Sequence, residues 1–319
     1  LKIALAYFRA IGKPSKRILI GRERGYHGTG FGGLSVGGIV NNKKQFERFL
    51  PDVYHIPHTH NLEHNSFSKG QPIWGDHLAD DLQNQIEKHG ASNIAALIVE
   101  PVAGSTGVLI PPVGYLEKLR KICTDNDILL IFDEVITGFG RLGKPFAADF
   151  FNIEPDLMTI AKGLTSGTVP MAATLVSDRI CQTFMNGDPK VIDFFHGYTY
   201  SAHPLACAAA IATLDVYKKG NLLFRASEIS KYWEEALHSL KGTKHIIDIR
   251  NLGLIGAVEL ESIADKPSRR AYNVLCEAFR DQKLFVRVTG DIIALSPPLI
   301  VQRHEIDLII EKLKKTINS

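Results

Sequence analysis

Short apolar segments alternate with amphipathic helical segments through the first half of the chain, and this alternation constrains the fold more than any other feature. The apolar segments are typical of strands that are buried on both faces of a sheet. Helices between such strands favour a parallel sheet that is covered on both sides. The expected strands span residues 17–21, 94–99, 128–132, 157–160 and 172–176, and the expected helices span residues 1–10, 76–89 and 115–125.

The pattern changes after an alanine-rich helix that we expect at residues 202–217. The remainder mixes helices and strands, which is typical of a smaller α+β domain. A chain of 319 residues is long enough for two domains, so we expect a large domain at residues 1–217 and a small domain at residues 218–319. The expected helices of the small domain span residues 224–240, 269–281 and 304–317, and its expected strands span residues 246–251, 254–260, 284–288 and 292–295.

Composition excludes several classes of protein. The chain is 45% hydrophobic and 22% charged, with a formal net charge of +3, which is ordinary for a globular protein. It contains no long basic run that would suggest nucleic-acid binding and no apolar run of membrane-spanning length. The widely spaced cysteines favour a reducing compartment such as the cytoplasm over a disulfide framework or a zinc site. They are Cys123, Cys181, Cys207 and Cys276.

Charged residues lie just beyond three of the expected strands: Glu100, Asp133 and Lys162. Ligands of open α/β sheets bind at the carboxyl ends of strands. Small neighbours of Lys162 leave room for a bulky group on its amine, and partial burial would make that amine a competent nucleophile. Position alone favours an ordinary loop lysine, and Asp133 could equally cap a turn or pair with an arginine.

The region around Asp133 and Lys162 resembles the signature of the class III aminotransferases, enzymes of pyridoxal-phosphate (PLP) fold type I. The resemblance continues through most of the chain and is closest to the ω-amino acid:pyruvate aminotransferases. It implies an α/β fold with a mostly parallel central sheet, helices on both faces and a smaller C-terminal α+β domain. The segments that carry it are IFDEVITGFGRLGKPFAADFFNIEPDLMTIAKG, GYHG, VEPVAGSTGVLIPPVGYL, HGYTYSAHPLACAAA and RVTGDIIALSPPLI.

The resemblance also implies how the cofactor, pyridoxal 5'-phosphate, is bound. Lys162 matches the lysine that forms the Schiff base and moves a proton between the substrate and the cofactor. Asp133 matches the partner of the pyridine nitrogen. Val135 and Tyr26 match the residues on the two faces of the ring, and His27 lies beside Tyr26. An aliphatic and an aromatic side chain hold a planar ring by dispersion and burial.

Two further residues are assigned by the resemblance. Thr199 matches a threonine that binds the cofactor phosphate of the neighbouring subunit, which implies a homodimer or a higher homo-oligomer. Arg287 matches an arginine that binds the substrate carboxylate, a group that guanidinium binds in bidentate fashion. Many relatives that use glutamate have a glutamate at the position of Ser105. Since Ser105 cannot form that ion pair, we expect pyruvate rather than 2-oxoglutarate as the keto acid.

The resemblance implies a Gly-Ser loop that binds the phosphate, and residues 1–12 contain nothing similar. We expect this loop to lie ahead of Leu1, so that the N-terminal part of the family fold is absent from this chain. The chain is then expected to bind PLP weakly or not at all as it stands.

Other patterns are weaker. Gly28, Gly30 and Gly33 superficially match a dinucleotide fingerprint, but we expect no helix after them. Four histidines at positions 55, 58, 60 and 64 are expected to form a polar loop rather than a metal site. We expect Arg141 to support a loop, Pro101 after Glu100 to stiffen a strand exit, and residues 194–203 to form an interface.

The leading functional hypothesis is therefore transamination between an ω-amino acid or primary amine and a keto acid through Lys162. One alternative keeps the site but changes the reaction to that of an aminomutase or a decarboxylase of the same fold. Another is an inactive fragment that lacks the phosphate loop. We expect no metal, nucleic acid or membrane among the partners.

Overall fold

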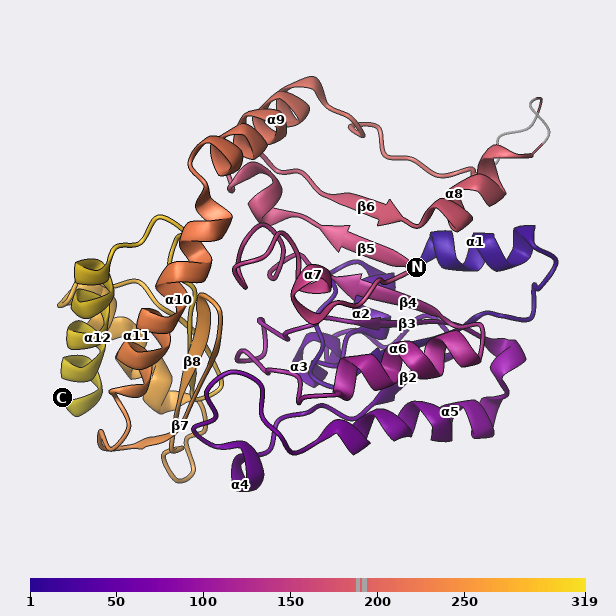
Figure 1. Cartoon of the computed structure of the whole chain (residues 1–319). Helices are drawn as coiled ribbons and strands as arrows, with labels where there is room; N and C mark the ends of the chain where they lie inside the picture. Colours follow the sequence, from indigo (N-terminus) through magenta and orange to yellow (C-terminus); the bar gives the residue numbers. More distant parts are fainter. Residues whose placement is uncertain (188–189, 191–193) are drawn as a thin grey trace.

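A six-stranded sheet forms the centre of the larger part of the molecule (Figure 1), a computed structural model that describes residues 1–187, 190 and 194–319. Its strands lie in the order β2-β1-β3-β4-β5-β6. All neighbouring pairs are parallel except β5 and β6, which are antiparallel. The mostly parallel sheet is thus confirmed. The strands are β1 (Ile18–Arg22), β2 (Val53–Ile56), β3 (Ile94–Val99), β4 (Leu129–Asp133), β5 (Leu157–Ile160) and β6 (Ala173–Val176).

Both faces of the central strands are apolar, and successive side chains alternate between two cores. In β4, Leu130 and Phe132 belong to one core, while Leu129 and Ile131 belong to the other. Such two-sided burial explains why these strands consist of continuous apolar runs in the sequence. The carboxyl ends of β1, β3, β4 and β5 therefore lie along one edge of a rigid sheet.

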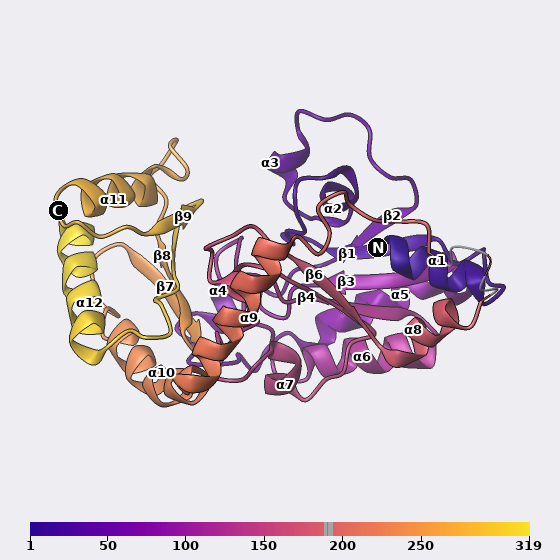
Figure 2. The same ribbon diagram turned by 90° about the horizontal axis from the view of Figure 1, so that it is seen from above.

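Helices cover the two faces of this sheet (Figures 1 and 2). One face packs against α1 (Lys2–Ala10) and α8 (Asp178–Met185), and the other packs against α5 (Asp81–His89) and α6 (Tyr115–Asp125). A 3-10 turn, η1 (Asp76–Asp80), leads into α5, so the single helix expected there has two parts. No helix in the described part of the chain is both long and apolar enough to span a bilayer.

Several short helices lie in the connections, and one of them corrects an expectation. The glycines after β1 are followed by α2 (Phe31–Val36), where no helix was predicted. This helix forms because Leu34 and Val36 are buried against the sheet, so tertiary packing outweighs the poor helix propensity of glycine. The others are α3 (Val40–Lys43), α4 (Leu62–Asn65), α7 (Ala147–Phe151), η2 (Ala91–Asn93) and η3 (Lys162–Thr165).

A second, antiparallel sheet with the strand order β7-β8-β10-β9 lies beside the first (Figure 2). Together with three helices it encloses a separate core around Trp233, Val258 and Ile306. Its strands are β7 (Ile246–Leu252), β8 (Ile255–Leu260), β9 (Arg287–Thr289) and β10 (Ile292–Leu295), and its helices are α10 (Leu222–His238), α11 (Arg269–Arg280) and α12 (Arg303–Asn318).

The long helix α9 (Pro204–Lys219) connects the two parts and passes into α10 through Gly220 and Asn221. The domain boundary expected after residue 217 falls in the last turn of α9. It stays a prediction: the small sheet has a core of its own around Trp233, but its residues Leu252, Ile255, Ala257 and Ile292 belong to the core of the large sheet.

The central position of β3 leads to a stability prediction. Leu97 is fully buried between two strands, so Leu97→Ala should reduce the free energy of unfolding by about 2–5 kcal/mol. Leu175 on the edge strand β6 is 45% exposed, and Leu175→Ala should change it by about 0.5 kcal/mol at most. Urea denaturation followed by circular dichroism measures both values. Equal losses would contradict this assignment of the core.

Candidate active site

Three ionisable residues meet at the carboxyl edge of the large sheet, as the strand-end argument predicts. Asp133 ends β4, Glu100 follows β3, and Lys162 lies two residues beyond β5. Because β3, β4 and β5 are adjacent and parallel, these residues are neighbours in space although they are far apart in sequence.

Asp133 is 9% exposed and has two partners. Its Oδ1 accepts a hydrogen bond from the backbone N–H of Val135 at 3.2 Å. Its Oδ2 lies 2.9 Å from Nδ1 of His27, whose other ring nitrogen is buried without a partner among the described residues. A carboxylate offers about four lone-pair positions, so Asp133 can accept further hydrogen bonds.

The sequence predicted only that Pro101, after Glu100, stiffens the exit of the strand. In the structure Glu100 has a larger role. Its Oε1 accepts a hydrogen bond from the backbone N–H of Tyr26 at 2.9 Å, which fixes the backbone beneath the Tyr26 side chain. Its carbonyl accepts one from Nη2 of the buried Arg22 at 2.7 Å. Burial raises the pKa of the Glu100 carboxyl group. In the sequence, the position of Glu100 at the end of a buried strand was the feature that pointed to a role in the site.

Lys162 begins a tight turn with a left-handed backbone, at φ +43°. Two features of its neighbourhood hold this turn in place. Gly163 packs so closely that an added Cβ would lie 2.8 Å from the side chain of Phe139. The carbonyl of Gly163 accepts a hydrogen bond from the hydroxyl of Tyr217, on α9, at 2.6 Å. These contacts hold in place the backbone from which the Lys162 side chain extends.

The surrounding protein changes the acidity of Lys162. The side chain is accessible from the cavity it faces, yet burial of the amine lowers its pKa. The charges of Asp133 and Glu100 oppose this shift, while the charge of Arg287 adds to it. A lower pKa leaves more of the amine neutral, the form in which it acts as a nucleophile or a base.

A cavity of about 970 Å³ brings Lys162 together with Val135 and Arg287. Asp133 lies behind it, between Val135 and His27. Arg287 begins β9 of the small sheet, and within the described residues it has no carboxylate partner. The cavity therefore combines an amine, an unpaired guanidinium and apolar walls, a combination suited to a small organic anion.

Thr199 lies apart from these residues. It is exposed, in the segment between α8 and α9, and does not line the cavity. Arg141 does line it, and donates hydrogen bonds to the carbonyls of Leu254 and Pro297 at 3.1 and 2.5 Å. These bonds confirm that Arg141 supports a loop.

The four histidines of the 55–64 segment have separate partners. His55 lies 2.9 Å from the carbonyl of Gly37, and His64 stacks on Trp74 with ring centroids 4.6 Å apart. Nδ1 of His58 accepts a hydrogen bond from the backbone N–H of His60. The fourth, His60, groups with Asp248 and Glu259 rather than with the other three histidines.

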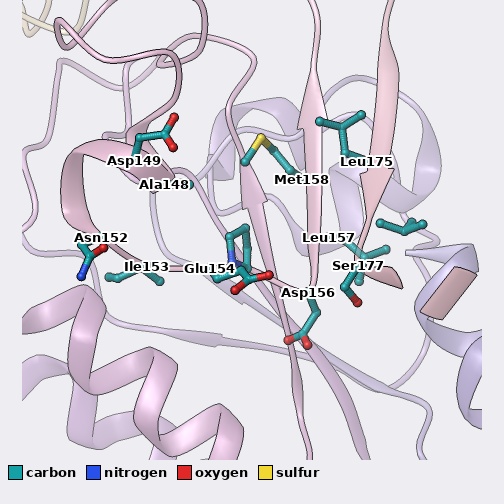
Figure 3. A pocket seen from close by; sticks show the side chains of 12 residues that line it. Ala148, Asp149, Asn152, Ile153, Glu154, Asp156, Leu157, Met158, Leu175 and Ser177 are labelled. Carbon is teal, nitrogen blue, oxygen red and sulfur yellow. The ribbon is translucent and has the colours of Figure 1, made fainter. Parts of the chain in front are cut away.

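A second cavity, of about 530 Å³, lies at the opposite end of β5 (Figure 3). Asp156 lines this cavity, but the hydrogen-bonding capacity of its carboxylate is already used. It accepts hydrogen bonds from the backbone N–H of Leu130 and from the guanidinium groups of Arg120 and Arg179, each within 2.9 Å. Asp156 thus connects strand and helix, so this cavity lacks the free reactive groups that Lys162 and Arg287 provide in the larger one.

Comparisons with known proteins agree on one family. The family described as aminotransferase class-III matches residues 1–317. The chain is 57% identical over 317 residues to an omega-aminotransferase of Caulobacter vibrioides, covering 99% of this chain and 72% of that protein. It is 46% identical over 322 residues to a beta-alanine–pyruvate aminotransferase of Pseudomonas aeruginosa, covering 100% of this chain and 71% of that protein.

Solved structures give the same result for the fold. The omega transaminase of Pseudomonas jessenii in complex with PMP superposes with a TM-score of 0.92 at 32% identity. The match covers 99% of this chain and 71% of that chain. A transaminase with L-ala matches with a TM-score of 0.92 at 30% identity, covering 99% of this chain and 76% of that one.

The environment of Lys162 predicts a specific pH dependence in the cofactor-free protein. A lowered pKa means that Lys162 becomes neutral at a lower pH on titration with base, and only the neutral amine reacts with acetic anhydride. Lys118 is the matched reference, since its hydrogen bond to Asp80 raises its pKa. Acetylation measured by peptide mass spectrometry should reach half its maximum at lower pH for Lys162 than for Lys118.

The variant Asp133→Asn tests the cause of this difference. Asp133 raises the pKa of Lys162, so removal of its charge should move the acetylation midpoint of Lys162 to still lower pH. The midpoint of Lys118 should not move. A rise in the Lys162 midpoint would contradict the proposed electrostatics.

Proposed function

Because the chain belongs to the class-III aminotransferases, we propose that it catalyses transamination between an ω-amino acid or primary amine and pyruvate, with PLP as its cofactor. The observation that carries this proposal is the position of Lys162. Its amine of lowered pKa faces a cavity that also contains an unpaired arginine, beside the buried carboxylate of Asp133. The names of the two similar proteins, from Caulobacter and Pseudomonas, support the same reaction.

The residues around the cavity are suited to PLP. Asp133 is a buried carboxylate with unused lone pairs, and a protonated pyridine nitrogen is a cationic partner for it. His27, through its contact with Asp133, orients the carboxylate, and its buried second nitrogen is free to bind a further group. We assign Val135 and Tyr26 to the two faces of the ring, where an aliphatic and an aromatic side chain bury it.

Bound PLP supplies a carbonyl carbon that bonds to amines and a ring that takes up electrons when a proton leaves the substrate. The chain supplies the groups that direct this chemistry. Nζ of Lys162 would be the group that holds the cofactor. When free, the same amine would accept the proton from the amine-bearing carbon of the substrate, so one side chain would serve as both nucleophile and base.

Arg287 binds the carboxylate of the substrate in this proposal. The residue at position 105, a serine, cannot neutralise Arg287, so the guanidinium stays available to each substrate in turn. Arg141 also lines the cavity, but its guanidinium already binds two backbone carbonyls. With Arg287 as the anchor, the cavity favours acids with one carboxylate, such as pyruvate and β-alanine, over dicarboxylates.

A homodimer follows from the position of Thr199 and from the surface of α9. The described residues of α9 and of the segment before it expose large apolar side chains, and only Ala206 and Ala210 of α9 are buried. An apolar surface of this kind marks an interface. We assign Thr199 to the phosphate of the cofactor in the other subunit. The most exposed of these side chains are Phe195, Tyr198, Tyr200, Leu205 and Ile211.

We also propose a cytoplasmic location. The four cysteines are free thiols in the structure, which suits a reducing compartment. Cys123 is buried in the core, and burial raises its pKa to about 12, so it is an inert thiol.

The assignment of Lys162 predicts the outcome of two measurements. Borohydride reduction of the cofactor-loaded enzyme should fix the cofactor to Lys162, which peptide mass spectrometry identifies. Lys162→Ala should lower kcat by at least about 10³-fold, because it removes both the nucleophile and the base. Lys314→Ala, an exposed lysine of α12, is the matched control and should retain activity. Reduction at another lysine would overturn the assignment.

The reaction itself is tested by its products. Incubation with pyruvate and β-alanine should yield alanine. Release of carbon dioxide without amino transfer would instead identify a decarboxylase of the same fold.

The assignment of Thr199 to the cofactor phosphate of the other subunit predicts that cofactor binding depends on dimer formation. Thr199→Ala removes one hydroxyl donor to a phosphate, and should raise the Kd for PLP about tenfold while the dimer persists. Thr199→Ser keeps the hydroxyl and should bind PLP almost normally. Sedimentation velocity measures the assembly and fluorescence titration the binding. A fully active monomer would contradict the shared site.

A further inference from the structure

Three arginines bind the backbone of one buried loop, at residues 103–109. The loop closes on itself through two backbone hydrogen bonds between Ala103 and Leu109, of 3.0 and 3.1 Å. Its four central carbonyls all point to guanidinium groups. Ser105 accepts from Arg287 at 3.3 Å, Thr106 from Arg24 at 3.0 Å, and Gly107 and Val108 from Arg250 at 2.9 and 3.1 Å.

Arg250, on β7, makes the most extensive of these contacts. Its Nε donates to both Gly107 and Val108, and its Nη2 makes a second bond to Gly107 at 2.7 Å. Gly107 has φ +109°, and an added Cβ would lie 2.5 Å from Ile292. Only glycine allows this approach, so the contact between the loop and the small sheet depends on the glycine at position 107.

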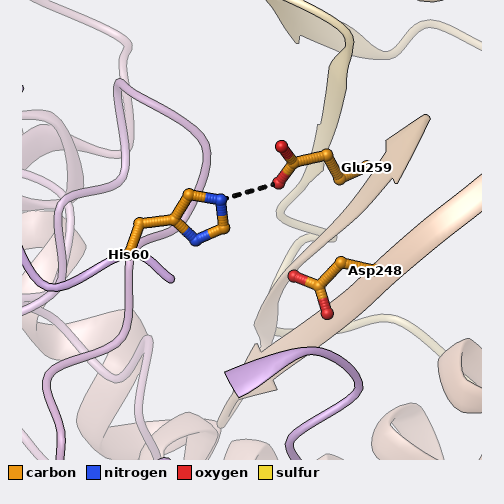
Figure 4. A group of neighbouring side chains, drawn as sticks. All are labelled: His60, Asp248 and Glu259. Carbon is orange, nitrogen blue, oxygen red and sulfur yellow. Dashed lines mark ion pairs between the residues drawn. The ribbon is translucent and has the colours of Figure 1, made fainter. Parts of the chain in front are cut away.

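Acidic residues fix Arg250 in turn. Its Nη1 is hydrogen-bonded to the carboxylates of Asp248 and Glu259, the latter at 2.7 Å. His60, from the large part of the molecule, lies 3.1 Å from the same oxygen of Glu259 (Figure 4). Burial opposes ionisation of Glu259, but the neighbouring His60 and the charge of Arg250 lower its pKa to about 2.

The group His60, Asp248 and Glu259 resembles a metal site by composition. Arg250 already supplies the positive charge that these carboxylates require, since one nitrogen of its guanidinium contacts both. The group therefore serves to orient Arg250, and through it the loop.

The loop matters for recognition because Arg287 rests on it. The carbonyl of Ser105 is a neutral acceptor at 3.3 Å, so this hydrogen bond is weaker than one to a carboxylate. A substrate carboxylate can displace it at small cost. The position of the Ser105 carbonyl therefore determines the position of the Arg287 guanidinium group when no substrate is bound.

We propose that Arg250 is a positioning residue for substrate recognition. By fixing the carbonyls of Gly107 and Val108, it fixes the carbonyl of Ser105 and thereby the resting position of Arg287. This inference rests on the proposed function, in which Arg287 binds the substrate carboxylate.

The test compares substrates with and without a carboxylate. Arg250→Lys keeps the charge between Asp248 and Glu259 but cannot reproduce the set of hydrogen bonds to the loop. It should raise KM for β-alanine and pyruvate about tenfold, the effect of losing a well-placed hydrogen bond. KM for 1-phenylethylamine, which has no carboxylate, should change less than about twofold. Calorimetric titration of the loaded enzyme with propionate should show the same tenfold loss of affinity.

Arg225→Lys is the matched control. Arg225 also binds two backbone carbonyls, those of Ile300 and Val301, but does not touch the loop. It should leave the KM ratio between the two substrate classes unchanged. Should Arg250→Lys fail to fold, Glu259→Gln removes one anchor of Arg250 and should produce a smaller shift of the same kind.

A double-mutant cycle separates this proposal from the proposed function. If Arg250 acts through Arg287, then Arg250→Lys should have little further effect on KM for β-alanine in the background of Arg287→Ala. Equal losses for both substrate classes, or full additivity in the cycle, would overturn the positioning role and leave transamination intact. Loss of the Lys162 adduct would overturn transamination itself.

Discussion

The parallel pairing of β3, β4 and β5 is the constraint on which the site depends. Three adjacent parallel strands must end at the same edge of the sheet, so the residues that follow them are brought together although they lie far apart in the sequence. Both faces of these strands are buried, and a shift in their register would disrupt the close packing of both cores. The hydrophobic core thereby fixes the distance between Asp133 and Lys162, which are 29 positions apart in the sequence.

The charged groups at this edge are arranged so that few of them neutralise one another. Asp133 is bonded to a histidine and a backbone amide, and Glu100 to the backbone N–H of Tyr26. Arg287 rests on a neutral carbonyl. Had these groups formed tight ion pairs, each would have to be broken before a ligand could bind. The structure instead satisfies them with weak or neutral partners, which leaves their charge available to a cofactor and a substrate.

The sequence predicted most of this architecture but only part of the environment of the site. Long apolar runs such as that of β3 predict buried strands directly. The positions of Asp133 and Lys162 after such strands predict that they belong to the site. The short strand β2 and the helix α2 went unpredicted, because tertiary packing rather than local propensity forms them. The contacts of Arg250 with Gly107 join residues 143 positions apart, and no local pattern reveals such a pair. The hydrogen bond between Glu100 and the backbone of Tyr26, which follows the neighbouring strand β1, could likewise be seen only in the structure.

The hydrogen bond between Tyr217 and Gly163 has a consequence for how such enzymes can diverge. Helix α9 presents its apolar side outwards, while Tyr217 on the same helix holds the turn of Lys162. The exposed apolar side chains of α9 and the geometry of the Lys162 amine therefore depend on one rigid element. A substitution on the outer side of α9 that shifts the helix is transmitted to the turn of Lys162 through this bond and through the packing of Ala210 and Tyr217 against Leu164 and Phe139. The outer side of α9 and the turn of Lys162 therefore cannot evolve independently.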